Sequence, residues 1–115
     1  MHIDDYRFGK IVVDGCVYDS DLMVCGEEIY PNWWRKEGHN LCLEDLQWLL
    51  EKKPKILIIG KGNLGCMAVP EEVLNNLKQQ HIEVHIANTG PAVGVYNRVV
   101  EERTGKIGAT FHLTC

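Results

Sequence analysis

The spacing of hydrophobic positions predicts strands in the first part of the chain and alternating strands and helices after it. Two apolar runs flank Asp14-Gly15, a dipeptide that favours a two-residue hairpin turn because glycine accepts a positive φ at no steric cost. A second hairpin is expected around Gly26, and Pro31 restricts its last strand to a sheet edge or breaks it. The strands predicted here cover residues 8–13, 17–18, 22–25 and 28–34.

The remaining residues follow helical and strand periodicity in turn. Ile56–Ile59 has no polar alternation, which is typical of a strand covered on both faces, and we expect it at the centre of the sheet. Further strands are predicted over 82–87 and 106–113, and helices over 43–52, from Pro70 and over 91–103. The pattern indicates a single α/β domain over residues 1–115. Its central sheet is mixed and partly parallel, with helices packed on it and an N-terminal β-hairpin layer.

Composition narrows the class of protein. The formal net charge is −4 and there is no basic stripe, which argues against nucleic acid as a partner. No segment approaches the roughly 20 apolar residues of a membrane span, and the acidic N-terminal residues do not resemble a signal or transit peptide. Five widely spaced cysteines fit a reducing compartment. We therefore expect a cytoplasmic protein that does not bind a membrane.

The run Gly60-Lys61-Gly62-Asn63-Leu64-Gly65 matches the letters of a dinucleotide-binding fingerprint. In that motif the helix begins within the glycines, whereas Pro70 places the helix start several residues later. Glu71 and Glu72 then occupy the first turn, where they would repel a phosphate. The glycines are better explained by a sharp turn at the end of a strand, and no cofactor is predicted.

A stronger candidate for anion binding lies at the next strand end, at Asn88-Thr89-Gly90 before the third helix. No carboxylate occupies that helix's first turn, so its free amides could hold a carboxylate or phosphate, with charge from Lys61. The alternative is an ordinary N-cap, in which Thr89 or Gly90 satisfies the helix's own donors. His39 or His112 would transfer protons if the site were an active site. The candidate ligand-binding residues are Gly60, Lys61, Gly62, Asn88, Thr89, Gly90, Asn97, His39 and His112.

Other catalytic or metal sites have little support. His39–Cys42 and His112–Cys115 share a spacing that two zinc-binding pairs can have, but neither pair carries a tight glycine turn, and we predict no metal. Cys66 has no evident activating base. No catalytic residue is therefore assigned, and the sequence favours a non-enzymatic role while leaving an enzyme open.

Trp33-Trp34-Arg35 is the candidate partner surface. Adjacent side chains on a strand face opposite ways, so at least one indole is expected to be poorly covered. Exposed Trp beside Arg is typical of interface hot spots. The alternative places both rings beneath the first helix.

Several motifs together resemble a known family. Thr89-x-x-Ala92-Val93-x-x-Tyr96-Asn97, followed by Phe111-His112-x-Thr114-Cys115, is similar to the domain of the adipogenesis-associated domain-containing protein, with its uncharacterised prokaryotic homologues. More distantly, it resembles the mitochondrial assembly factor for respiratory complex I. The resemblance implies a compact α/β domain with a binding or assembly role and no established reaction. The expected partner is an unidentified protein, and the expected oligomeric state is a monomer or weak homodimer.

Overall fold

The computed structural model describes residues 1–115 and contains two sheets. The antiparallel N-terminal sheet has the order β1 (Ile3–Arg7), β2 (Lys10–Val13) and β3 (Cys16–Tyr18). The larger sheet contains β4 (Leu22–Cys25), β5 (Glu28–Tyr30), β6 (Ile56–Gly60), β7 (Glu83–Ala87) and β8 (Ile107–Phe111), in the order β5-β4-β8-β6-β7. Because β6 is parallel to β7 and β8 while β4 is antiparallel to β8 and β5, the predicted mixed sheet is confirmed.

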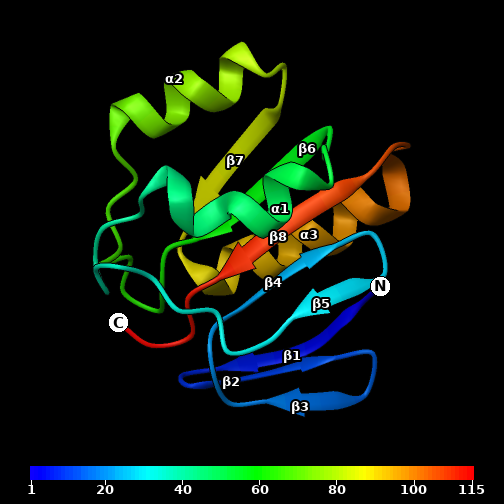
Figure 1. Ribbon diagram of the computed structural model, residues 1–115. Helices are drawn as coiled ribbons and strands as arrows, with labels where there is room; N and C mark the ends of the chain where they lie inside the picture. Colours follow the sequence, from blue (N-terminus) through cyan, green and yellow to red (C-terminus); the bar gives the residue numbers. More distant parts are fainter.

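The helices cover both faces of the larger sheet (Figure 1). They are the 3₁₀ turn η1 (Leu43–Leu46), α1 (Gln47–Glu51), α2 (Glu71–Gln79) and α3 (Thr89–Glu102). The η1, α1 and α2 elements pack on one face, and α3 packs on the other face beside the N-terminal sheet. None of these helices combines the length and the apolar composition that a membrane span requires.

Strand β6 shows why an uninterrupted apolar run folds this way. Ile56 and Ile58 enter the core shared with α3 and the N-terminal sheet, whereas Leu57 and Ile59 enter the core beneath α1 and α2. Alternate side chains of a strand point to opposite faces, so a strand between two cores must be apolar at every position. The expectation that this strand is the central one was wrong, because β8 is the middle strand and β6 lies beside it.

Other sequence expectations were met or corrected locally. Asp14 and Gly15 both have positive φ, 48° and 81°, as the predicted hairpin turn between β2 and β3 requires. The second hairpin is present with β5 at the sheet edge, but β5 ends at Tyr30, directly before Pro31. The helix predicted over 43–52 is divided into η1 and α1, and strand β1 was not predicted.

Candidate partner-binding groove

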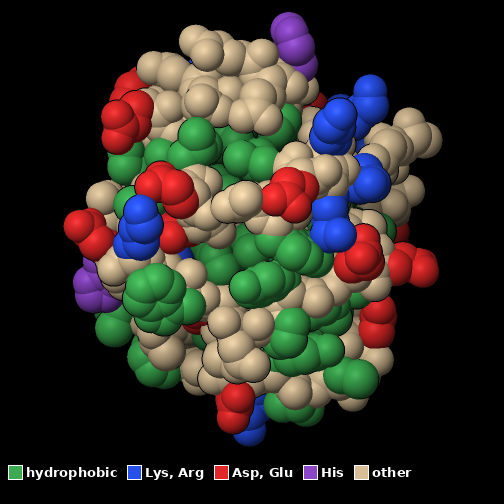
Figure 2. Space-filling view, viewed as in Figure 1, with side chains coloured by type: hydrophobic (Ala, Val, Ile, Leu, Met, Phe, Trp, Pro, Cys, Tyr) green, Lys and Arg blue, Asp and Glu red, His purple; other side chains and the backbone are tan.

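The main candidate site is a surface groove of about 430 Å³ between α1 and the chain segment that follows β5. All three tryptophans of the chain line it, together with Tyr30. Figure 2 shows apolar side chains exposed on this face of the molecule among acidic and basic ones. We call it the aromatic groove; its lining residues are Met23, Tyr30, Trp33, Trp34, Lys36, Glu44, Asp45, Gln47, Trp48 and Glu51.

Trp33 forms the inner part of the groove. Its side chain is 5% exposed, and its indole Nε1 donates to the backbone oxygen of Asp45 at 2.8 Å. The guanidinium of Arg35 lies over the ring, 4.8 Å from the centroid. A buried indole with its N–H satisfied and a cation on its face is held rigidly.

Trp34 is the exposed member of the pair, with 76% of its surface accessible. The expectation that one of two adjacent indoles is poorly covered is confirmed. The expectation that Trp33 and Arg35 share the exposed surface was wrong, since Arg35 is also buried. Their side chains point inward, where the core covers Trp33 and a partly buried carboxylate pairs with Arg35.

The other side of the groove is formed by Tyr30, at the end of β5, and Trp48, on α1. Their ring centroids are 5.4 Å apart and the planes are tilted by 56°, a favourable arrangement for an aromatic pair. The ammonium of Lys52 lies 4.7 Å from the centre of the Trp48 ring and pairs with Glu28 at 3.0 Å. Sequence reasoning missed both aromatic residues because they come from separate elements that only the docking of α1 on β4 and β5 brings together.

The groove is acidic, with three carboxylates and one lysine among its lining residues. Lys36 Nζ lies 2.8 Å from Glu44 Oε2, which lowers the pKa of Glu44 and raises that of Lys36. Asp45 accepts hydrogen bonds from the backbone amides of Lys36 and Cys42. Glu51 accepts only from the neutral side-chain amide of Gln47, at 3.1 Å, and so keeps its charge uncompensated.

A buried polar cluster lies behind Trp33. Arg35 Nη1 donates to Asp21 Oδ2 at 2.7 Å, and its Nη2 donates to the backbone oxygen of Gly38 at 2.8 Å. The same Asp21 oxygen lies 2.7 Å from His112 Nδ1, so we place a proton on that nitrogen. Asp21 Oδ1 accepts from the Leu113 amide. The cluster thereby ties the residues after β8 to the start of β4 and to the loop that carries Trp33.

Asp21 is ionised in this setting. Burial raises the pKa of its carboxyl, but hydrogen bonds from His112, the Leu113 amide and Arg35 outweigh that effect and hold the pKa below its usual value. His112 is 6% exposed, and its Nε2 has no hydrogen-bond partner. Asp21 was not identified as a site residue from the sequence, because its partners lie far away along the chain.

The candidate anion corner is a closed junction. Thr89 Oγ1 accepts from the Gly62 amide at 2.8 Å and donates to the His112 backbone oxygen at 2.6 Å. The Thr89 amide donates to Gly62 O at 2.9 Å. A Cβ on Gly60 would lie 3.0 Å from Thr89 Oγ1, so this glycine serves close packing.

Few backbone amides at the N-terminus of α3 are free to bind an anion. The Ala92 amide bonds to Asn88 O, Pro91 has no amide hydrogen, and the Gly90 amide is the donor that stays open. No surface depression is lined by Gly60, Gly62 or Thr89. The geometry gives the corner a structural role, and its binding of an anion stays a prediction.

The remaining candidates are divided between this corner and other places. Lys61 lies in the same loop and is half-buried. His39 is exposed, with its ring edge-on to that of His112 at 6.3 Å between centroids. Asn97 instead makes two hydrogen bonds to the backbone of Ile3 in β1. Its Oδ1 accepts from the Ile3 amide and its Nδ2 donates to the Ile3 carbonyl oxygen, both at 2.9 Å. No group of three or more His, Cys, Asp or Glu side chains is arranged to hold a metal ion.

The fold defines a class of small α/β domains, in which a mixed five-stranded sheet carries a three-stranded antiparallel sheet beside α3. Comparison with known families identifies this one. The chain belongs to the family described as protein of unknown function (DUF498/DUF598), whose model matches residues 3–112.

Solved structures share this fold along almost the whole chain. A conserved hypothetical protein from Pyrococcus horikoshii OT3 is 24% identical, with a TM-score of 0.81 and full coverage of both chains. A protein from Bartonella henselae, described as an outer membrane protein, is 24% identical with a TM-score of 0.80, covering 98% of this chain and 94% of that one. An Mth938-like domain from Bordetella pertussis is 16% identical with a TM-score of 0.76, covering 97% and 85%.

Proposed function

We propose that this domain is a non-enzymatic protein-binding or assembly module and that the aromatic groove receives its partner. The observation that carries the proposal is that all three tryptophans and Tyr30 line one groove. Trp and Tyr dominate the binding energy of protein interfaces because they bury a large area and lose few rotamers. Trp34 in particular leaves a large apolar ring in water, which a partner would cover.

The groove suits a short segment of a partner better than a metabolite. It opens onto the surface of the molecule, whereas metabolite sites enclose most of the ligand. The resemblance to the adipogenesis-associated domain family supports an assembly role as well. Five free cysteines fit action in the reducing cytoplasm, where we place the protein.

Selection of short random peptides displayed on phage tests the proposal. We expect peptides that bind the wild-type domain and lose binding to the Trp34→Ala variant. Phe8→Ala is the matched control, because Phe8 is also an exposed aromatic residue, 58% accessible, but lies outside the groove. If no peptide is selected, or if the selected peptides bind Trp34→Ala as well as wild type, the proposal is wrong.

A further inference from the structure

The three indoles of the aromatic groove differ in whether a cation of this chain lies over the ring. Trp33 has the guanidinium of Arg35 over its ring at 4.8 Å, and Trp48 has the ammonium of Lys52 at 4.7 Å. Trp34 has no cation of this chain over its ring, although it is the most exposed of the three. An indole face attracts cations through its negative electrostatic potential, so the ring of Trp34 is an unused cation acceptor.

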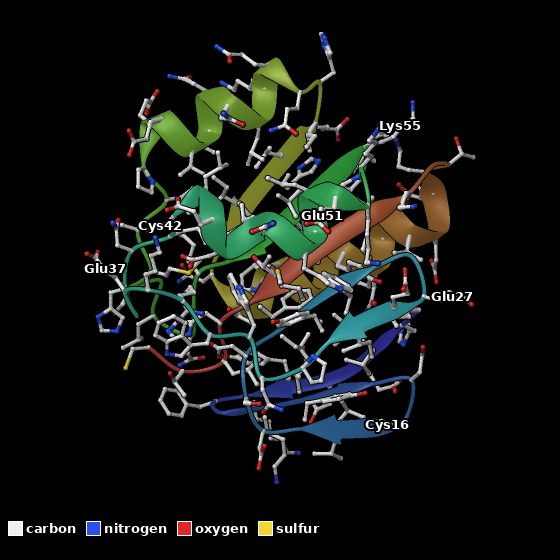
Figure 3. The ribbon with its side chains drawn as sticks, in the orientation of Figure 1. Cys16, Glu27, Glu37, Cys42, Glu51 and Lys55 are labelled. Atoms are coloured by element: carbon white, nitrogen blue, oxygen red, sulfur yellow. The ribbon has the colours of Figure 1, made fainter.

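The charges that line the groove favour the same kind of ligand. Lys36 is engaged with Glu44, whereas Glu51 has no cationic partner. In Figure 3 Glu51 projects from the end of α1 on the near side of the molecule, the face that carries the groove. A cation entering the groove therefore meets an open indole face and an uncompensated carboxylate.

We infer that the groove recognises an arginine side chain of the partner, stacked on Trp34 and drawn in by the carboxylates of the groove. This inference rests on the proposed function and names the chemistry of the segment that binds. Arginine fits better than lysine, because its planar guanidinium stacks on an indole and is more weakly hydrated. Arg35 on Trp33 shows the same pairing inside this chain.

Matched synthetic peptides test the inference. One capped peptide carries a single arginine between leucines, and three others replace that arginine with citrulline, lysine or norleucine. Citrulline keeps the shape and removes the charge. By isothermal titration we expect the citrulline and norleucine peptides to bind about tenfold more weakly than the arginine peptide. The affinity of the lysine peptide should lie between that of the arginine peptide and those of the two uncharged peptides. Only the arginine and lysine peptides should lose affinity as the NaCl concentration is raised.

Variants of the protein separate charge from apolar contact. Trp34→Leu keeps an apolar side chain and removes the indole face, so it should reduce arginine binding while changing norleucine binding little. Glu51→Gln should weaken arginine binding, and Glu27→Gln, at the turn between β4 and β5 and outside the groove, is the matched control with the same charge change.

The outcomes distinguish the two claims. Equal affinity of the arginine and citrulline peptides would overturn the inference and leave the groove as a docking site for apolar side chains. Tighter binding of lysine than of arginine would overturn the choice of arginine. Failure of all four peptides to bind at millimolar concentration would also overturn the inference, whereas failure of the phage selection overturns the proposed function itself.

Discussion

His112 Nδ1 and Asp21 Oδ2 lie 2.7 Å apart, although 91 positions separate the two residues in the chain. Through the same carboxylate, His112 is connected to Arg35. The guanidinium of Arg35 stacks on Trp33, which lines the aromatic groove. The polar cluster therefore supports the groove from behind. It also explains how buried charges are tolerated in so small a domain, since each has a partner of the opposite sign or a backbone group.

Replacement of Asp21 should destabilise the domain strongly. Asp21→Asn leaves the buried Arg35 without its counter-ion, and we expect a loss of about 3 kcal/mol in the free energy of unfolding. Urea denaturation followed by tryptophan fluorescence measures this. Asp19→Asn, at an exposed neighbouring position, should change stability by less than about 0.5 kcal/mol. Equal effects of the two substitutions would contradict the role given to Asp21.

The same carboxylate predicts a pH dependence. The pKa of Asp21 in the folded state lies below its ordinary value of 3.8, so the ionised form is favoured by folding. Its contribution to stability is therefore complete above that value and is lost as the pH falls through the lower, folded-state pKa. Urea denaturation at about pH 6 and about pH 3 measures the free energy of unfolding at each pH. The decrease in this free energy from pH 6 to pH 3 should be smaller for Asp21→Asn than for the wild type. An identical loss in both proteins would contradict the direction of this shift.

Glu83 offers a second titration with a clear cause. Bidentate hydrogen bonds from Arg103 and one from His85 lower the pKa of Glu83 to about 2. Removal of the guanidinium in Arg103→Ala should raise that pKa toward the ordinary 4.5. Carbon-13 NMR of the side-chain carboxyl follows the titration directly. A wild-type midpoint near the ordinary value would show that the ion pair does not persist in solution.

Substitution by alanine at two glycines should change the stability of the domain in opposite directions. Gly62 has a φ of 108°, and a Cβ there would lie 2.5 Å from the backbone carbon of Cys115, so Gly62→Ala should cost more than about 3 kcal/mol. Gly94 lies inside α3 with nothing within 4 Å of such a Cβ, and Gly94→Ala should stabilise the domain by about 0.5–1 kcal/mol. Thermal unfolding of both variants measures the pair. A Gly62→Ala protein as stable as wild type would mean that the junction is loosely packed.

The elements that could be predicted from the sequence are those whose buried positions recur as a regular pattern of apolar residues along the chain. β6 was recognised because both faces are covered, and the turn at Asp14-Gly15 because its backbone needs positive φ. Strand β1 was missed because Ile3 is its one fully buried residue, so no alternation marks it. What holds β1 is long-range, since Asn97 of α3 bonds both backbone groups of Ile3.

The groove was predictable only in part, for the same reason. Alternation along an extended segment predicts that one of two adjacent indoles faces outward, but it does not say which. The burial of Trp33 depends on its bond to Asp45 and on Arg35, whose partner Asp21 precedes β4 and is itself bonded to His112 after β8. The contributions of Tyr30 and Trp48 depend on how α1 docks, which no local pattern encodes.

The proposal that the aromatic groove binds a protein segment is tested most directly by NMR titration of the isotope-labelled domain with a selected peptide. We expect shifts of the Trp34 and Trp48 indole signals and of amides around the groove. In the Trp34→Ala variant the affinity should fall by at least about 30-fold, with the thermal midpoint unchanged. Shifts confined to the junction around Gly62 and Thr89, with full affinity retained by Trp34→Ala, would contradict the account.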